Sequence, residues 1–193
     1  DGGEVKDCYS AGSVTGSHYT GGVAGYVDGG GTVQDCYATG SVTGNESVGG
    51  VVGFVNTNGV VRRCAALNSS VSGTYDVGGV AGTVEEGTVE HCYATCSVTG
   101  SYYVGGVVGH AFNFDYLLCC YATGSVTGQY SVGGVVGSVE YVTVNGCAAL
   151  NPSVSGRSNV GRVAGYGSNV TFQYNWAFSG MTVTVDGTVT PIT

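Results

Sequence analysis

The sequence predicts an all-β protein, a single-stranded β-solenoid with about 28 residues per coil and six to seven coils. One observation is the nonapeptide CYATGSVTG, which occurs at residues 36–44 and again at 120–128. Another is a position that recurs at a nearly constant interval, at Cys8, Cys36, Cys64, Cys92, Cys120, Cys147 and Asn175. A third is composition, since no segment has a helical period and Val, Thr, Tyr and Gly favour short strands ended by glycine bends. Periodicity leaves the handedness open, and a right-handed coil is expected.

Most repeats contain the same elements in the same order. A Ser-Val-Ser/Thr triplet and a glycine follow the recurring position, and then a block such as VGGVVG at 48–53. Parallel in-register stacking would place equivalent residues about 4.8 Å apart, giving a rod roughly 30 Å long. The repeats at Cys64 and Cys147 instead read CAALNSSVSG and CAALNPSVSG, so a slower period of three coils is superimposed.

Alternation assigns residues to the two faces of each strand. Cys36 and Ala38 fall on the inner side and Tyr37 on the outer side, so the cysteines are expected to form an internal structural ladder of Cys8, Cys36, Cys64, Cys92, Cys120 and Cys147. An outer aromatic stripe is expected from Tyr9, Tyr37, Tyr93, Tyr121 and Trp176, interrupted by Ala65 and Ala148. The triplets predict an outer hydroxyl stripe whose threonines are Thr15, Thr43, Thr99 and Thr127. Both stripes are candidate binding surfaces.

The chain shows no internal linker. We expect one solenoid over residues 1–180. Residues 181–193 leave the repeat but still alternate, which predicts one or two extra strands that cap the rod or contact a neighbouring subunit.

Composition limits the partners and the compartment. With 13 acidic and 5 basic residues the net charge is −8, which disfavours nucleic acid and anionic membranes. No apolar run approaches the roughly 20 residues that span a bilayer. Only 9% of residues are charged and eight are cysteines, a composition more typical of extracellular or cell-surface proteins.

The units CYATGSVTGNESVGGVVG and CAALNPSVSGRSNVGRVAG resemble GLUG-motif repeats, with valine at the leucine position of the Gly-Leu-any-Gly block. The resemblance covers residues 4–185, in six copies in phase. It implies a β-helical module of a large bacterial cell-surface protein, as in adhesin-like proteins and in non-catalytic regions of zinc IgA-protease relatives. The His-Glu-x-x-His signature of such proteases is absent from the sequence, so no proteolytic role carries over.

Candidate catalytic and metal-binding groups do not converge within the repeat. His18, His91 and His110 fall at different phases, and only His91 has another ligand type, Cys119, at its phase one coil on. Because a metal site needs several converging ligands, we expect no metal, no cofactor and no enzymatic activity.

A carbohydrate-active enzyme stays an alternative. Glycoside hydrolysis uses two carboxylates that face each other across the scissile bond. Asp7 and Asp35 precede the ladder cysteine in adjacent coils, but stacking would place them side by side in a mixed polar stripe.

The redox state of the ladder is open. Stacked cysteines have Cα atoms close enough for a disulfide, but parallel Cα–Cβ vectors hold the Cβ atoms too far apart for good geometry. We expect free thiols, with inter-coil disulfides as the alternative. Cys119 should face outward, where it could form a disulfide to another molecule.

The expected function is structural. An open solenoid exposes strand edges at both ends, so we expect end-to-end self-association into a filament, or an adhesin stalk continued by neighbouring repeats of a larger protein. The alternative is an ice-binding or glycan-binding solenoid that uses the Ser/Thr and Tyr stripes.

Overall fold

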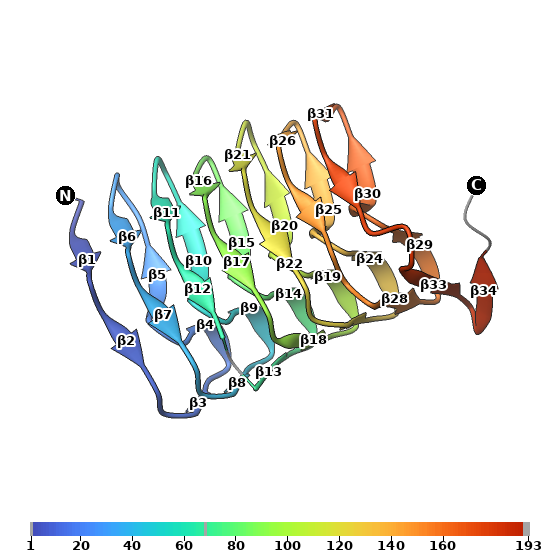
Figure 1. Cartoon of the computed structure of the whole chain (residues 1–193). Coiled ribbons are helices and arrows are strands. Elements are labelled where there is room, and N and C mark those ends of the chain that lie inside the picture. The colour runs from blue at the N-terminus through green and yellow to red at the C-terminus, as the bar shows by residue number, and fades with distance from the viewer. Residues whose placement is uncertain (1, 68, 191–193) are drawn as a thin grey trace.

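The computed structural model describes residues 2–67 and 69–190. Outside it lie residues 1 and 68 of the predicted solenoid segment 1–180, and residues 191–193 of the predicted terminal segment 181–193. The described residues form strands, turns and bends and contain no helix, which confirms the all-β prediction. Five short strands make one coil, and successive coils stack into five sheets, named A to E here in chain order (Figure 1).

In each coil the strand of sheet A is followed by a bend, the ladder position and the strand of sheet B. The strands of sheet A are β1 (Glu4–Lys6), β6 (Thr32–Gln34), β11 (Val60–Arg62), β16 (Thr88–Glu90), β21 (Tyr116–Leu118), β26 (Thr143–Asn145) and β31 (Thr171–Gln173). Those of sheet B are β2 (Tyr9–Ser10), β7 (Tyr37–Ala38), β12 (Ala65–Ala66), β17 (Tyr93–Ala94), β22 (Tyr121–Ala122), β27 (Ala148–Ala149) and β32 (Trp176–Ala177).

Sheets C, D and E complete each coil. Sheet C contains β3 (Val14–Thr15), β8 (Val42–Thr43), β13 (Ser70–Ser72), β18 (Ser97–Thr99), β23 (Val126–Thr127), β28 (Ser153–Gly156), β33 (Thr182–Val185) and β34 (Thr188–Thr190). Sheet D contains β4 (His18–Gly21), β9 (Glu46–Gly49), β14 (Tyr75–Gly78), β19 (Tyr102–Gly105), β24 (Tyr130–Gly133) and β29 (Ser158–Gly161). Sheet E contains β5 (Ala24–Val27), β10 (Val52–Asn56), β15 (Ala81–Glu85), β20 (Val108–Phe112), β25 (Val136–Glu140) and β30 (Ala164–Ser168).

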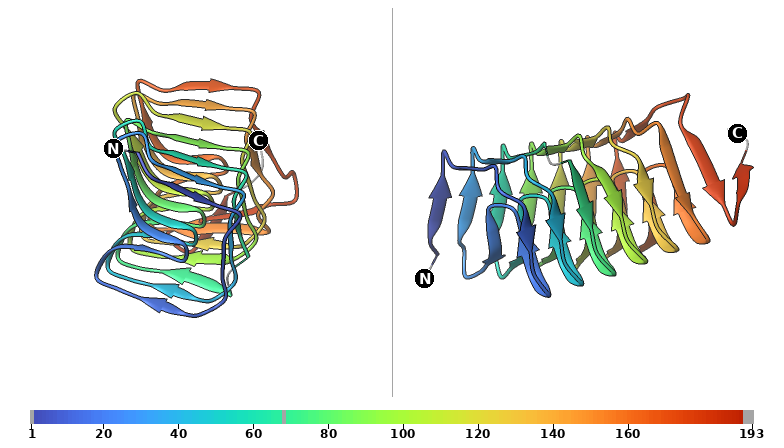
Figure 2. Two further views of the ribbon diagram at one scale, coloured as in Figure 1. Left: turned by 90° about the vertical axis from the view of Figure 1, so that its left-hand side faces the viewer. Right: turned by 90° about the horizontal axis from the view of Figure 1, so that it is seen from below.

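Each strand pairs in parallel with its equivalent one coil on, in the register set by the repeat. Val33 pairs with Val61, and Val61 with Val89. Figure 2 shows the coils following one another along the rod. Sheets D and E have six strands, and sheets A and B have seven because β31 and β32 begin a further coil. The β-solenoid predicted from the repeat is confirmed, and its coils follow the predicted period.

The core is a column of small apolar side chains. Valines from sheets A, C, D and E and alanines from sheet B are buried along the rod, for example Val61, Val71 and Ala94 at 0% exposure. β-Branched valines suit this setting because they pack well on a pleated sheet. Burial decreases in the first and last coils, where Val5 and Val170 are only partly buried.

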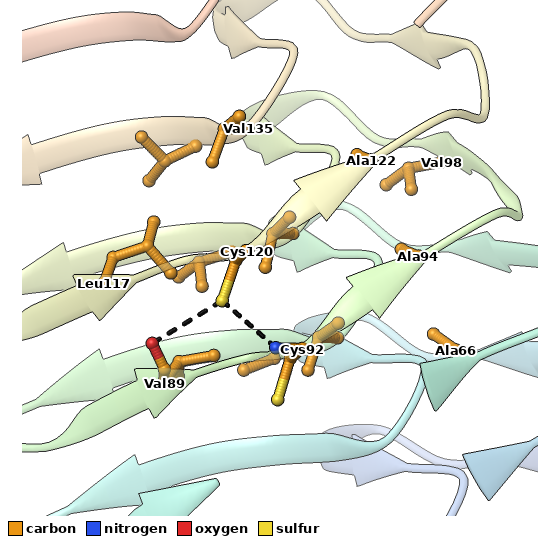
Figure 3. Packing of buried hydrophobic residues seen from close by; sticks show 14 of the residues in the cluster. Ala66, Val89, Cys92, Ala94, Val98, Leu117, Cys120, Ala122 and Val135 are labelled. Atoms are coloured by element: carbon orange, nitrogen blue, oxygen red, sulfur yellow. Dashed lines mark hydrogen bonds between the residues drawn. The ribbon is translucent and has the colours of Figure 1, made fainter. Parts of the chain in front are cut away.

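The cysteine at the ladder position connects coils by hydrogen bonds. The Cys92 N–H donates to Cys120 Sγ at 3.4 Å, and Cys120 Sγ donates to the Val89 carbonyl at 3.6 Å (Figure 3). Asn175 takes this role in the last coil, where its side chain accepts from the Cys147 N–H and donates to the Val144 carbonyl, both at 2.8 Å. A small side chain that both donates and accepts is therefore what this buried position requires.

The residue before the ladder position adopts the left-handed conformation in every coil. These residues have φ between 50° and 65° and are Asp7, Asp35, Arg63, His91, Cys119, Gly146 and Tyr174. The sequence predicts a mixed polar stripe at this position. In the structure these residues form a backbone bend between sheets A and B.

This bend predicts that Cys119→Gly stabilises the protein by about 0.5–1 kcal/mol in urea unfolding. The left-handed conformation costs a residue with a Cβ about 1–2 kcal/mol, and glycine removes this strain. Glycine also makes the unfolded chain more flexible, which offsets about 0.5–1 kcal/mol of the stabilisation. Gly146 already occupies the equivalent place with φ 65°, so Gly146→Ala should be destabilising by about the same amount. A destabilised Cys119→Gly variant would contradict the left-handed conformation at Cys119.

Sheets D and E pack face to face, through glycine, with an offset of one coil. A strand of sheet E lies against the sheet D strand of the preceding coil, as β20 lies against β14. A Cβ added at Gly109 of β20 would lie 2.5 Å from the Asp76 carbonyl carbon and 2.5 Å from the Val77 nitrogen. The glycines of the VGGVVG-type blocks are therefore needed because two backbones approach where a side chain would clash.

The end of the described chain continues the repeat before it departs from it. β33 pairs in parallel with β28, with Val183 opposite Val154. β34 then turns back and pairs antiparallel with β33, so it covers the edge of sheet C at this end of the rod.

Candidate functional site

The aromatic column on sheet B contains the predicted aromatic stripe in register. Its order along the rod is Tyr9, Tyr37, Ala65, Tyr93, Tyr121, Ala148 and Trp176. The rings of Tyr9 and Tyr37 stack with centroids 5.4 Å apart, and those of Tyr93 and Tyr121 at 5.0 Å. The side chains point outward, and the two alanines divide the column into separate stacks.

An ion pair lies beside this column at the bend. Arg63 donates from Nε and Nη2 to the two carboxylate oxygens of Asp35, both at 2.7 Å. The hydrogen bond from Arg63 lowers the pKa of Asp35, so this carboxyl group stays ionised at neutral pH. Both carboxylate oxygens of Asp35 therefore accept hydrogen bonds from Arg63.

The hydroxyl column on sheet C contains the predicted threonines. Thr15 pairs in register with Thr43, and Thr99 with Thr127. Ser72 and Ser155 occupy two further rungs, and each shares a hydrogen bond with the threonine of the coil before, at 3.2 Å to Thr43 and 3.3 Å to Thr127. Thr184 follows Ser155 in the last rung. The four predicted threonines are exposed, so they line one outer edge of the rod.

A second tyrosine stack lies on sheet D, outside the two predicted stripes. Tyr75, Tyr102 and Tyr130 stack with 5.0 Å between successive centroids. The signal for it is in the sequence, because a tyrosine lies two residues before the valine of the Val-Gly-Gly block in these three coils.

A polar seam lies where sheets D and E pack. Ser47 and Thr83 share a hydrogen bond at 2.8 Å, and His110 Nδ1 lies 3.6 Å from Asp76 Oδ1. Burial raises the pKa of Asp76 to about 6 and lowers that of His110 to about 4. At neutral pH the seam therefore holds a carboxylate beside a neutral imidazole.

The histidines remain dispersed over the rod. His18 lies 3.4 Å from Glu46 of the next coil, His110 is in the seam, and His91 is exposed in the bend beside Cys119. Within residues 2–67 and 69–190, no group of three or more His, Cys, Asp or Glu side chains is placed to hold a metal ion.

All eight cysteines are free thiols in the structure. Cys36, Cys64, Cys92, Cys120 and Cys147 of the ladder are buried, as is Cys96, whereas Cys8 in the first coil and Cys119 in its bend are exposed. Burial raises the pKa of the Cys96 thiol to about 11 and also raises that of Cys120. Hydrogen bonds within the ladder lower the pKa of Cys147, so pKa alone does not separate the buried thiols from the exposed ones. Access does, because a reagent in solution reaches only the two exposed thiols, and reactivity should be confined to them.

Thiol labelling should therefore give two phases. Ellman's reagent should modify Cys8 and Cys119 rapidly in the folded protein and all eight thiols in denaturant. Mild oxidation should produce disulfide-linked dimers on a non-reducing gel, and a Cys8→Ser/Cys119→Ser variant should stay monomeric on it. Rapid labelling of more than two thiols in the folded protein would contradict this prediction.

Two of the cavities on the outer faces of the rod lie against the turns and against the aromatic column. One of about 420 Å³ lies at the turns between sheets E and A and is lined in part by Glu86, Asn113 and Phe114. The other, of about 370 Å³, lies on the aromatic column between Tyr37 and Tyr93. The second has the more regular walls, because both are tyrosines of the same column.

The described residues include no helix long and apolar enough to cross a membrane.

Comparisons with known proteins identify the repeat. The GLUG motif matches residues 16–43 and 73–99, and each match runs from sheet D of one coil to sheet C of the next. No curated protein matches the chain. A solved structure from Bacteroides ovatus, of a protein provisionally described as an immunoglobulin A1 protease, is similar with a TM-score of 0.75 and 18% sequence identity. The similarity covers 98% of this chain and 62% of that one, and at this identity it shows the fold alone. The chain is therefore a β-solenoid that carries GLUG-motif repeats.

Proposed function

We propose that the chain is a non-catalytic structural element of a bacterial extracellular or cell-surface protein, whose rod associates end to end with further copies. The observation that carries the proposal is the uniform stacking of coils, which leaves strands able to accept another coil at both ends. β1 and β31 are the terminal strands of sheet A, and β5 and β30 those of sheet E. Such edges are templates for pairing with another chain.

Apolar side chains at the two ends support this association. Val5 and Ala24 line a cavity of about 200 Å³ in the first coil, and Val163, Ala164 and Phe172 line one of about 420 Å³ at the other end. A second copy would bury both surfaces in one heterologous contact, and such a contact can repeat into a fibre. Since β34 covers sheet C, the contact would use sheets A, B, D and E.

Electron microscopy of the purified chain tests the proposal. We expect fibres at high protein concentration, and a Val163→Glu variant should give separate rods because it places a charge in the contact. Thr43→Glu, on the outer face of sheet C, is the matched control and should still form fibres. Separate rods of the wild-type chain at every concentration would overturn the filament and leave an adhesin stalk as the structural role.

The hydroxyl column supports one other candidate function. Thr15 and Thr43, and Thr99 and Thr127, occupy adjacent rungs, and a regular array of this kind is the arrangement that an ice-binding solenoid would use. Thermal hysteresis of a concentrated solution would support that role, and its absence would dismiss it.

A further inference from the structure

The aromatic column lacks a ring at Ala65, which leaves a gap the size of one ring. Tyr93 and Tyr121 are one rung apart, with 5.0 Å between centroids. Tyr37 and Tyr93 are two rungs apart with Ala65 between them, so their rings are separated by about twice that distance, roughly 10 Å. The space between them is what a tyrosine ring occupies elsewhere in the column, and it coincides with the cavity of about 370 Å³.

The walls of this gap are apolar and its rim is polar. Ala65, only 7% exposed, forms the floor, and Leu67, at 38%, closes one side. The ion pair of Arg63 and Asp35 lines the other side. Arg63 uses Nε and Nη2 toward Asp35 and Gln34, which leaves the N–H groups of Nη1 to donate to a ligand.

We propose that this gap binds one hexopyranose ring of a glycan, sandwiched between Tyr37 and Tyr93. A pyranose has the size of a six-membered ring, C–H groups on both faces and hydroxyl groups around its edge. Its faces would contact the two tyrosine rings, and its edge would meet Arg63 and Asp35. A plain aromatic ring would fill the same space but would cover the ion pair without offering it a hydrogen bond, which is costly.

A second gap occurs three rungs further along, about 14 Å away. Tyr121 and Trp176 form its walls, Ala148 its floor, and Leu150 takes the place of Leu67. The slower period of the sequence therefore places a ring-sized gap in every third coil. The second gap has Cys119 and Gly146 where the first has Asp35 and Arg63, so it should bind the sugar more weakly.

Saturation-transfer NMR with a panel of methyl hexopyranosides, including gluco, galacto and manno forms of both anomers, tests the proposal. Benzene, which has no hydrogen-bonding group, is the probe for a plain aromatic ligand. A single hexose contacts few atoms, so the expected dissociation constant is in the millimolar range. The decisive variant is Ala65→Tyr/Leu67→Thr, which gives this rung the residues of its neighbours and should fold because those rungs already stack. Thr15→Ser, on sheet C, is the matched control.

We expect at least one hexoside to bind, and the filled variant to bind it at least tenfold more weakly while Thr15→Ser binds as wild type does. Three results would overturn the proposal: no hexoside signal, a signal unchanged by Ala65→Tyr/Leu67→Thr, or benzene bound more tightly than every hexoside of the panel. The gap lies on the side of the rod, so this inference is independent of the proposed end-to-end association. Sugar binding by separate rods would refute only the filament, and fibres without sugar binding would refute only the gap.

Discussion

Gly109→Ala is expected to lower the free energy of unfolding by about 3 kcal/mol or more, or to prevent folding. The added Cβ would meet backbone atoms of Asp76 and Val77 at 2.5 Å and the Gly82 carbonyl oxygen at 2.7 Å. None of these atoms is the end of a flexible side chain. Relief would require sheets D and E to separate, and the same contact recurs in the neighbouring coils, so one coil cannot move alone.

Gly12→Ala is the matched control. A Cβ at Gly12 meets none of the described atoms within 4 Å, and its backbone does not have a positive φ. Its stability should therefore change by less than about 0.5 kcal/mol. Urea unfolding followed by far-ultraviolet circular dichroism measures both variants. A folded Gly109→Ala protein with the stability of Gly12→Ala would show that sheets D and E do not pack as closely as described.

This contact also explains what the sequence could not predict. The repeat shows that VGGVVG-type blocks recur, and their glycine pairs indicate that another segment packs closely there. They do not show which sheet that segment belongs to. Sheet E packs against the preceding coil's sheet D, so Ser47 bonds to Thr83 and Asp76 lies beside His110. Neither pair occupies equivalent positions of two repeats, so alignment of the repeats does not bring these residues together.

Pairs one coil apart could be predicted, because stacking converts equal phase into contact. Tyr9 and Tyr37 are stacked, and Cys92 bonds to Cys120, in columns read from the alignment. The ring-sized gap at Ala65 could also have been found in this way, since the alanine interrupts the stripe in the sequence. The pairing of Arg63 with Asp35 in its rim could be found in the same way, because the two residues are 28 positions apart and share one phase. The alignment does not show the left-handed backbone bend at both residues.

Asp115 is expected to make the protein less stable as pH rises from 4 to 8. This carboxyl group is 2% exposed and accepts hydrogen bonds from the Gly87 N–H at 2.7 Å and the Phe112 N–H at 2.9 Å. Burial raises its pKa to about 7 from an ordinary value of 3.8, against the opposing effect of the two N–H donors. The folded state therefore holds the proton more tightly than the unfolded chain does.

The sign and size of the effect follow from linkage. A raised pKa in the folded state means that the stabilisation is fully present below pH 3.8 and is lost as pH rises through about 7. A shift of about three units corresponds to at most about 4 kcal/mol. Asp115→Asn cannot ionise, so its stability should lack this dependence. It should be the less stable protein at pH 4, because its amide replaces one acceptor by a donor, and should approach the wild type at pH 8.

Urea unfolding of both proteins at intervals from pH 4 to pH 8 measures the difference. Contributions from Asp76 and His110 are common to the two proteins and cancel in it. Asp76→Asn is the comparison variant, because the pKa of Asp76 is raised only to about 6 and its effect should be complete at a lower pH. Parallel stability curves for the wild type and Asp115→Asn would mean that Asp115 is already ionised in the folded protein at pH 4, and its two N–H bonds would then outweigh its burial.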